Sequence, residues 1–366
     1  MKHKYEKSLV KIKCRGGLMK KSIIALAASI AAVSFAPVAT AADKLLLKTP
    51  IAFKSTLPGL GSPIPRVAKE LDRMSGGSLK MKVYEPGKLV KAFEILDTVS
   101  SGKINSGYAT AGYWSGKMPA ASLFSAVPFG PETGEYMAWM YYGNGLKLYQ
   151  EMYDKNGYNV KVLPCAIIAP ETSGWFAKEI NKPEDLKGLK MRFFGLGGKV
   201  MQKLGVATSL LPGGDIFPAL EKGAIDATEF SMPAIDKLLG FHKLVKYNYF
   251  PGWHQQSTIF ELLVNKKVWG DMSAQHKAIL ENACKASMAD SYAEGEAIQH
   301  DVLKENVEKN GVKIKRWNPE MLAAFKGAWG EVVAEEKDEF FHKVLADMNK
   351  FRDGYKLWKD NAFLPR

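Results

Sequence analysis

The sequence predicts an α/β fold with two lobes and largely parallel sheets. Two blocks, residues 43–165 and 166–259, each alternate segments of strand character with segments of helix character, which is the pattern of a parallel sheet covered by helices. One helical pattern over residues 273–310 follows, and at 1.5 Å per residue such a helix would extend for roughly 55 Å. Because this length exceeds the width of a small domain, we expect the helix to span both lobes or to reach a second subunit.

The first block, expected to form lobe I, begins as a β-α-β unit. The pattern indicates a strand at 45–53, an amphipathic helix at 64–77 that ends in two glycines, and a strand at 79–87 closed by Pro-Gly. A helix is expected over 92–104, and then a short strand that leads into an aromatic loop over 105–117. In open α/β sheets ligands bind beyond the carboxyl ends of the strands, so the loops there are the expected place for a site.

The second block, expected to form lobe II, repeats this alternation in shorter elements. Strands, one of them preceded by a turn, are predicted at 158–168, 183–194 and 225–230, and helices at 197–205 and 216–223. The segment 257–269 is apolar on both faces, as expected for a hinge strand that crosses between lobes, so part of 260–310 should return to lobe I. Ser273 can cap the long helix, and the tail over 311–366 is predicted as further helix.

The N-terminal region differs in kind from the rest of the chain. Residues 19–42 have the form of a signal peptide, with two lysines after Met19, an apolar run of 14 residues, and small residues before a cleavage point near Ala41 or Ala42. The run is shorter than the roughly 20 residues that span a bilayer. Residues 1–18 would make the basic region of this signal unusually long, so we expect Met19 to be the true start and 1–18 to be a mis-assigned start.

Charge and cysteine content are both changed by removal of this segment. The whole chain has 51 basic and 38 acidic side chains, a net charge of +13, whereas residues beyond 42 hold 43 and 37, a net charge of about +6 without a Lys/Arg block. A nucleic-acid surface is therefore not expected. Cys165 and Cys284 remain, and their apolar surroundings favour buried thiols, although an oxidising compartment would permit one disulfide.

The catalytic motifs that we tested are missing or broken. The chain has no HExxH, CxxC or GxSxG, its GLGGKV turn lacks the Ser or Thr that a Walker A motif needs after Lys199, and the same turn is one glycine short of GxGxxG. The histidines beyond the signal show no metal-ligand spacing and are interpreted as surface or structural groups: His242, His254, His276, His300 and His342. The sequence thus offers no nucleophile or assembled catalytic set.

Two charged residues, Glu229 and Arg192, lie at positions where a charged group is expected to have a partner of opposite charge. Glu229 shares one side of the predicted strand 225–230 with Ile225 and Ala227, and an unpaired carboxylate on an apolar face is costly. It needs a cation, either a lysine or arginine of the same lobe or a metal ion. Arg192 ends a predicted strand before a glycine-rich turn, where it is either a solvated group or a fork that holds a ligand carboxylate.

Several stretches resemble one known family. They are EPGKLVKAFEILDTVSSGKI, YATAGYWSGKMPAASLFSAVPFG, PEDLKGLKMRFFGLGGKVMQKLGV, PGGDIFPALEKGAIDATEFSMP and YFPGWHQQST. This combination resembles the extracytoplasmic solute receptors of TRAP transporters, the DctP-type family, and is most similar to the branch that binds 2-oxo acids. The resemblance covers nearly all of the chain beyond the signal. It implies a two-lobed periplasmic binding protein whose ligand is buried between the lobes and whose long helix spans both.

The resemblance also implies site residues. The family arginine that grips the substrate carboxylate matches Arg192, and the cation that bridges protein and ligand, usually Na⁺, would be held by Glu171, Glu229, the carbonyl of Phe230 and Gln255. Relatives often have glutamine at the position of Glu171 and tryptophan at that of Phe230. A second carboxylate adds negative charge, which shifts the expected preference toward Ca²⁺ unless Glu171 is protonated or points away.

Four aromatic side chains are candidates for the cleft wall. Tyr113 and Trp114 would lie on the opposite lobe from Arg192 and close over the ligand, so that water is excluded from the arginine pair. Phe194 and Trp253 are expected to line the same cleft. Ordinary core packing is the alternative for each of these rings.

The predicted function is therefore capture, without catalysis, of a small 2-oxo or 2-hydroxy monocarboxylate in the periplasm. The resemblance implies three kinds of partner: the small organic acid, the two integral membrane subunits of a TRAP transporter, and a second copy of the chain through the long-helix region. A receptor for a dicarboxylate or another organic acid, or a ligand-sensing subunit, are alternatives. A secreted enzyme with Glu229 as base and Arg192 as orienting group is a remote one, because no nucleophile or second acid is provided.

Overall fold

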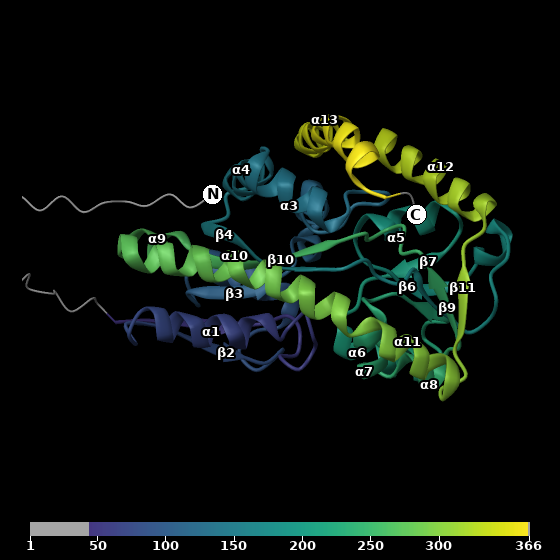
Figure 1. The fold of residues 1–366 in the computed structure, drawn as a ribbon, viewed down its shortest axis with the longest axis horizontal. Coiled ribbons are helices and arrows are strands. Elements are labelled where there is room, and N and C mark those ends of the chain that lie inside the picture. The colour runs from purple at the N-terminus through teal and green to yellow at the C-terminus, as the bar shows by residue number, and fades with distance from the viewer. Residues whose placement is uncertain (1–43, 365–366) are drawn as a thin grey trace, which may run out of the picture. The chain divides into compact units, whose positions relative to one another are not determined.

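Three sheets, two in the first lobe and one in the second, organise the computed structural model, which describes residues 44–364 (Figure 1). The first lobe contains the parallel pair β1-β2 and the three-stranded sheet β3-β10-β4, and a bridge between Ile51 and Tyr108 connects the two. The bounds of these strands are β1 Leu45–Pro50, β2 Leu79–Tyr84, β3 Ser106–Ala109, β4 Val160–Ile168 and β10 Thr258–Asn265. Strand β10 is antiparallel to both β3 and β4, and every one of its residues is buried, the carboxylate of Glu261 included.

The second lobe is built on a six-stranded sheet in the order β11-β9-β5-β8-β6-β7. Its strands are β5 Gly174–Phe176, β6 Lys190–Arg192, β7 Ala207–Ser209, β8 Ala227–Thr228, β9 Tyr247–Phe250 and β11 Lys313–Arg316. The pairs β6-β7, β6-β8 and β9-β11 are parallel, whereas β5 is antiparallel to both of its neighbours. Two of the three parallel pairs contain β6, and one of these joins β6 to β8, the two strands that lead into the site.

Helices cover the sheets of both lobes. Those of the first lobe are α1 Pro63–Met74, α2 Ile95–Ser100, α3 Thr133–Tyr142, α4 Gly145–Lys155 and α9 Lys266–Asp271, with 3-10 turns η1 Ala92–Glu94, η2 Ala111–Trp114 and η3 Pro119–Phe124. Those of the second lobe are η4 Pro183–Leu186, α5 Gly195–Lys203, α6 Gly213–Glu221, α7 Pro233–Leu238 and α8 Phe241–Leu244. Helix α1 shows why these segments fold as they do, because proline starts it and Ile64, Val67 and Leu71 bury one face.

The predicted long helix is present but consists of two segments. Helix α10 (Ala274–Ala297) begins at Ser273, whose hydroxyl accepts from the His276 N–H, and it packs on β4 and α1 of the first lobe. Helix α11 (Gln299–Glu308) continues beyond Ile298 and packs on α7 of the second lobe. At the break the Gln299 side chain donates to the Gly295 carbonyl (2.6 Å), the acceptor that helix continuation would use. The two helices together follow both lobes (Figure 1).

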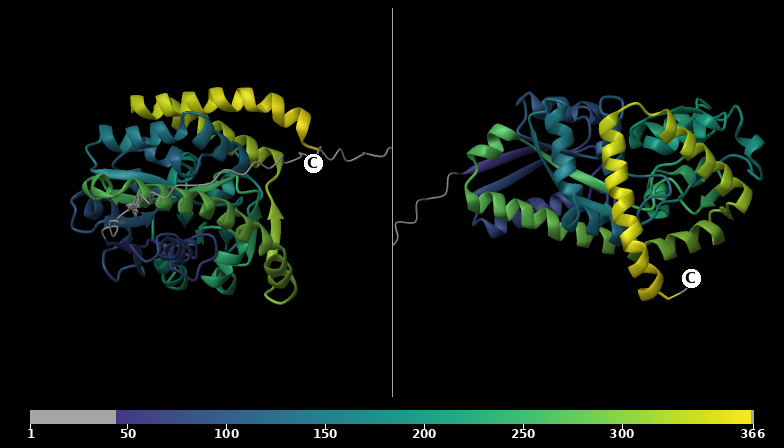
Figure 2. Two further views of the ribbon diagram at one scale, coloured as in Figure 1. Left: turned by 60° about the vertical axis from the view of Figure 1, so that its left-hand side comes forward. Right: turned by 90° about the horizontal axis from the view of Figure 1, so that it is seen from above.

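The C-terminal region also contacts both lobes. Helix α12 (Pro319–Glu335) packs on α5 of the second lobe, and α13 (Glu339–Ala362) packs on α3, α4 and η3 of the first lobe (Figure 2). The sequence predicted helix throughout this tail and missed β11, whose four residues are mostly exposed. No helix of the described residues is both long and apolar enough to cross a bilayer.

Cys165 and Cys284 form a disulfide that joins β4 to α10. The sequence interpretation of two separate buried thiols is therefore wrong. Both side chains are fully buried, so the apolar surroundings were interpreted correctly, but burial does not distinguish a thiol from a disulfide when the partner is 119 residues away. The predicted start and signal peptide, residues 1–42, lie outside the described residues.

Candidate ligand and cation site

The site forms where the chain crosses between the two sheets. Strands β6 and β8 are parallel neighbours with Arg192 opposite Thr228, so Arg192 and the next residue of β8, Glu229, emerge at the same sheet edge. The crossover from β4 to β5 supplies Glu171, and the crossover from β9 to β10 supplies His254 and Gln255. All five side chains are at most 3% exposed. Four separate segments of the chain thus converge on one buried place in the fold.

Arg192 and Glu229 form a buried ion pair. The Nη1 atom of Arg192 donates to Glu229 Oε1 (2.8 Å) and to the Glu229 carbonyl (2.6 Å), and Nε donates to the Leu211 carbonyl (3.1 Å). The Phe194 N–H also donates to Glu229 Oε1. Burial alone would raise the pKa of Glu229, but Arg192, followed by His254 and the Phe194 N–H, brings the pKa below its usual value. Glu229 is therefore a carboxylate at neutral pH.

The pKa of Glu171 is shifted in the opposite direction to that of Glu229. Burial raises its pKa well above the ordinary value, and the negative charges of Glu229 and Asp236 raise it further, more than Arg192 lowers it. Asp236 is fully buried as well, with Trp175 Nε1 donating to it at 2.8 Å, and burial likewise raises its pKa. Three carboxyl groups thus share one arginine, and burial favours the neutral forms of Glu171 and Asp236 unless a further positive charge, such as a metal ion, enters the site.

Several oxygens of the site have no hydrogen-bond partner in the described chain. They include Glu171 Oε2, Glu229 Oε2 and Gln255 Oε1. The Gln255 amide is oriented by a hydrogen bond from its Nε2 atom to Thr258 Oγ1 at 2.7 Å. Its oxygen, Oε1, then has no partner in the described chain. Unpartnered buried oxygens are costly, and carboxylate and amide oxygens are the ligands that Ca²⁺ and other hard cations take. The predicted ligands Glu171, Glu229 and Gln255 therefore fit a cation by their chemistry.

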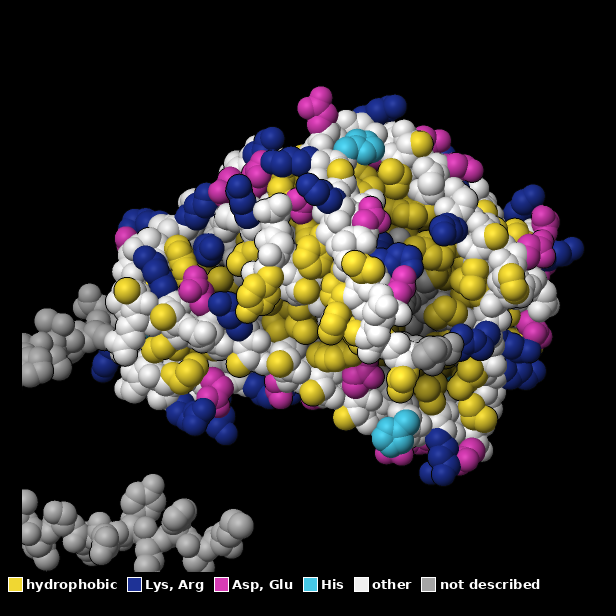
Figure 3. Space-filling model, turned by 45° about the horizontal axis from the view of Figure 1, so that its top comes forward, with side chains coloured by type: hydrophobic (Ala, Val, Ile, Leu, Met, Phe, Trp, Pro, Cys, Tyr) yellow, Lys and Arg dark blue, Asp and Glu magenta, His cyan; other side chains and the backbone are white. Residues whose placement is uncertain are grey.

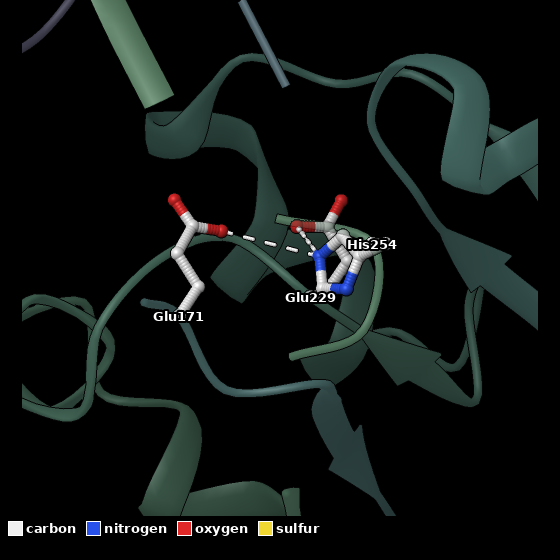
Figure 4. A group of neighbouring side chains, drawn as sticks. All are labelled: Glu171, Glu229 and His254. Carbon is white, nitrogen blue, oxygen red and sulfur yellow. Dashed lines mark ion pairs between the residues drawn. The ribbon is translucent and has the colours of Figure 1, made fainter. Parts of the chain in front are cut away.

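His254 joins this group although the sequence analysis interpreted it as a surface or structural residue. Its Nε2 lies 3.5 Å from Glu229 Oε2 and 4.0 Å from Glu171 Oε2 (Figure 4). One ligand atom from each of the three residues lies within 4.8 Å of the others, and neither ring nitrogen of His254 has a hydrogen-bond partner among the described residues. Its position next to Gln255, a predicted cation ligand, is the signal in the sequence that indicates it. A metal-ligand spacing motif does not, because such a motif describes ligands on one segment only.

A small cavity of about 20 Å³ lies against these groups. Its lining comes from both lobes: Phe53, Leu60, Thr110, Tyr113, Glu171, Arg192, Phe194, Phe230, Gln255, Thr258 and Phe260. A larger cavity of about 640 Å³ shares Phe53 and Phe230 with it, but contains neither Arg192 nor the site carboxylates. We place the site at the smaller cavity because the polar groups converge there, and the larger one is its mostly apolar continuation.

The two lobes meet directly over this cavity. The rings of Tyr113 and Phe194 lie 5.7 Å apart, and the Tyr113 hydroxyl has no partner in the described chain. A Cβ atom on Gly112 would lie 2.2 Å from the Phe194 ring, so only glycine permits this approach without displacing the ring. Burial raises the pKa of Tyr113, which keeps its hydroxyl protonated as a donor.

Two of the predicted wall residues lie outside the cavity lining. Trp114 is fully buried and donates its indole N–H to Glu261 at 2.7 Å. Trp253 stacks on Phe325 at 4.4 Å between ring centroids, in the core of the second lobe. The structure follows the packing alternative for both residues, whereas Tyr113, Phe194 and Phe230 do line the cavity.

Residues 62–339 match the sequence model of the DctP family, described as bacterial extracellular solute-binding protein, family 7. The chain belongs to this family. A monocarboxylate 2-oxoacid-binding periplasmic protein from Nostoc sp. is 34% identical to this family 7 receptor over 294 residues, which cover 80% of each chain. The resemblance inferred from the sequence motifs is thereby confirmed.

Two solved structures of TRAP solute-binding proteins are similar to this family 7 receptor. One from Pseudoalteromonas atlantica, with bound sodium and pyruvate, has a TM-score of 0.83 and 33% identity, covering 87% of this chain and 97% of that one. One from Bordetella bronchiseptica, a mixed-occupancy dimer with copurified calcium and picolinate, has a TM-score of 0.84 and 30% identity, covering 87% and 95%. The two-lobed fold is confirmed, and both similar proteins hold a metal ion with a small carboxylate.

Proposed function

We propose that this receptor captures a small 2-oxo monocarboxylate such as pyruvate, or its 2-hydroxy counterpart, together with a cation between its lobes. The observation that carries the proposal is the convergence of Arg192 and the unpaired oxygens of Glu171, Glu229 and Gln255 on one interlobe cavity. An anion and a cation can share this place because it offers an arginine and acceptor oxygens together.

Arg192 would hold the ligand carboxylate through its remaining donors. Both hydrogens of Nη1 and the hydrogen of Nε are used within the second lobe, and none of its hydrogen bonds to the described chain uses Nη2. The Tyr113 hydroxyl, also unpaired, faces the same cavity from the first lobe. A carboxylate that accepts from Nη2 and from Tyr113 would contact both lobes, so its binding energy favours the closed state.

Glu171, Glu229, Gln255 and the carbonyl of Phe230 are the proposed cation ligands. When bound, the ion supplies positive charge that the ligand's oxygens can share. A charge balance distinguishes two ions. With Asp236 neutral, as its raised pKa favours, and with Glu229, Glu171 and the ligand all ionised against Arg192, the site needs two positive charges, which favours Ca²⁺. A protonated Glu171 leaves a need for one positive charge, which favours Na⁺.

Thermal unfolding tests this proposal. The protein without residues 1–42 is refolded to strip ligand and is then measured with pyruvate, 2-oxobutyrate, lactate, succinate and sialic acid, each with Na⁺, Ca²⁺ or a chelator. A ligand at 100 times its Kd stabilises by about 2.7 kcal/mol, so ion-dependent stabilisation by short monocarboxylates is expected. Stabilisation only by a dicarboxylate or a sugar acid, without dependence on ions, would overturn the substrate and cation assignments.

The receptor is proposed to act in the periplasm and to deliver its ligand to the membrane subunits of a TRAP transporter, without chemical turnover. Recovery of pyruvate unchanged after long incubation with the protein is the expected result, and conversion would contradict it.

Charged side chains of both signs surround a band of apolar side chains on the face shown in Figure 3.

A homodimer is also proposed, through the C-terminal helices rather than α10. The end of α13 and the residues after it expose large apolar side chains that the described chain leaves uncovered: Leu357, Trp358, Phe363 and Leu364. The similar protein from Bordetella bronchiseptica is a dimer. Light scattering after size exclusion should give twice the chain mass for the wild type and a monomer for Trp358→Glu, and a wild-type monomer would contradict the proposal.

A further inference from the structure

A buried carboxylate in the first lobe, Glu261, has no part in the roles above. It is fully buried on β10, and three neutral groups donate to it: Trp114 Nε1 at 2.7 Å, the Tyr149 hydroxyl at 2.5 Å, and the Tyr153 hydroxyl at 2.7 Å from each oxygen. No cationic side chain of residues 44–364 forms an ion pair with it, and burial raises its pKa to about 6. A buried carboxylate without a cation is costly, so the presence of Glu261 at this position calls for an explanation.

Glu261 lies at an irregular point of the central strand. The register between β10 and β4 shifts between Phe260 and Glu261, and the β4 residue opposite Glu261 is Pro164, which has no N–H to donate. Phe260 lines the small cavity and packs edge-on against Phe53 at 5.2 Å. Successive residues of a strand point to opposite faces, so one residue faces the ligand cavity and the next holds Trp114.

Trp114 connects this carboxylate to the other wall of the cavity. It is the last residue of η2, directly after Tyr113. Tyr113 lines the cavity and contacts Phe53 of its own lobe and Phe194 of the second lobe, with both ring centroids at 5.7 Å. The bond from Trp114 to Glu261 therefore ties the turn that carries Tyr113 to the strand that carries Phe260.

We propose that Glu261 is a positioning residue for ligand capture, whose carboxylate fixes the wall of the first lobe on which the second lobe closes. It acts through Trp114 and touches neither ligand nor ion. The inference rests on the proposed function, because it concerns the same cavity. A merely structural role would join β10 to the α4 tyrosines and would change stability without changing affinity.

The test compares Glu261→Gln with Trp114→Phe and with the double variant. Glutamine keeps the shape and one acceptor oxygen, whereas phenylalanine removes the indole N–H from the same bond. Glu135→Gln is the matched control, because Glu135 is another buried carboxylate of the first lobe, lies outside both cavities, and pairs with Arg352 at 3.2 Å. Pyruvate Kd is measured by calorimetry at pH 7.5 with the ion that stabilises the wild type, and each variant's melting temperature is measured alongside.

Glu261→Gln is expected to raise the Kd on the order of 10-fold, as for loss of one hydrogen bond to a charged group. Trp114→Phe should raise the Kd by a similar factor. The double variant should have a Kd no higher than that of the single variant that binds pyruvate more weakly, because both changes remove the same contact between Trp114 and Glu261. Glu135→Gln should stay within about twofold of the wild type, since it touches no cavity residue. The melting temperature of Glu261→Gln should fall no further than that of Glu135→Gln.

Three results would overturn this inference: a wild-type Kd for Glu261→Gln, multiplicative effects in the double variant, or an affinity loss that only accompanies a lower melting temperature. Failure of the proposed function gives a different result. A wild type that binds no acid of the panel overturns that function and this inference together. Normal wild-type binding with an unaffected Glu261→Gln overturns the inference alone.

Discussion

Replacement of Arg192 by methionine tests the buried pair at the centre of the site. The change removes the three hydrogen bonds from Nε and Nη1 and leaves the Glu229 carboxylate fully buried without its cation. Breaking a buried ion pair on one side costs about 3–5 kcal/mol. At roughly 2–4 °C per kcal/mol, the melting temperature of the ligand-free protein should fall by roughly 10 °C.

The same change made together with Glu229→Gln separates the pair from simple loss of packing. The double variant buries no unpaired charge, so it should be about 2 kcal/mol more stable than Arg192→Met alone. Lys203→Met is the control, because its pair with Glu335 at 2.5 Å is partly exposed, and such pairs contribute at most about 1 kcal/mol.

The assay is urea unfolding at pH 7.5 with chelator, so that neither ion nor ligand contributes to stability. Pyruvate binding is measured on the same samples and should be lost in both Arg192 variants. A loss below about 1 kcal/mol for Arg192→Met would refute the reasoning, because it would equal the effect of an exposed pair. Strict additivity in the double variant would refute it as well, since it would show that the two side chains do not interact.

Three further results are expected. Gly112→Ala should weaken pyruvate binding by more than tenfold with little change in ligand-free stability, because a Cβ would lie 2.2 Å from the ring of Phe194 on the other lobe, a clash that separation of the lobes would relieve; the added change Phe194→Leu should restore affinity in calorimetry, and no recovery would contradict this. Glu171→Gln removes one carboxylate and should shift ion preference from Ca²⁺ toward Na⁺, measured by calorimetric competition; an unchanged preference would remove Glu171 from the ion site. The folded-state pKa of Glu261, about 6, is raised above its usual value near 4.5, so its stability contribution is present at low pH and is lost as pH rises through 6. Urea unfolding of the wild type relative to Glu261→Gln should therefore show a loss of about 2 kcal/mol between pH 4.5 and 7, and a constant difference would contradict the assignment.

The sequence predicted the part of the site that depends on strand ends. Arg192 was a candidate because it ends a predicted strand, and Glu229 was a candidate because it lies on the apolar side of another. The two strands are parallel neighbours in the structure, which brings both residues to one sheet edge. Trp114 and Trp253 were misplaced because a 3-10 turn and a crossover have no simple periodicity that tells which way a ring points. His254 was missed because the cation group is assembled from three segments rather than from one spaced motif.

The disulfide was beyond prediction for a related reason. Its two cysteines lie 119 residues apart, and no local pattern carries information about a pairing at that distance. The break at Ile298 was also unpredictable, because it depends on a side chain, Gln299, that bonds both the Gly295 carbonyl and the Ala234 N–H of another helix. The alternation of elements was predictable, but contacts made across the fold were not.

The bond between Cys165 and Cys284 encloses a covalent ring that contains five of the six strands of the second lobe's sheet, β5 to β9. A mechanical force applied at the two ends of the chain would pass through this bond and bypass the ring. At 3.3–3.6 Å per residue, roughly 400 Å of contour length would stay hidden from such a pull until the bond was reduced. Most of the lobe that carries Arg192 and Glu229 is therefore mechanically shielded, while α12 and α13, which lie outside the ring, bear the load.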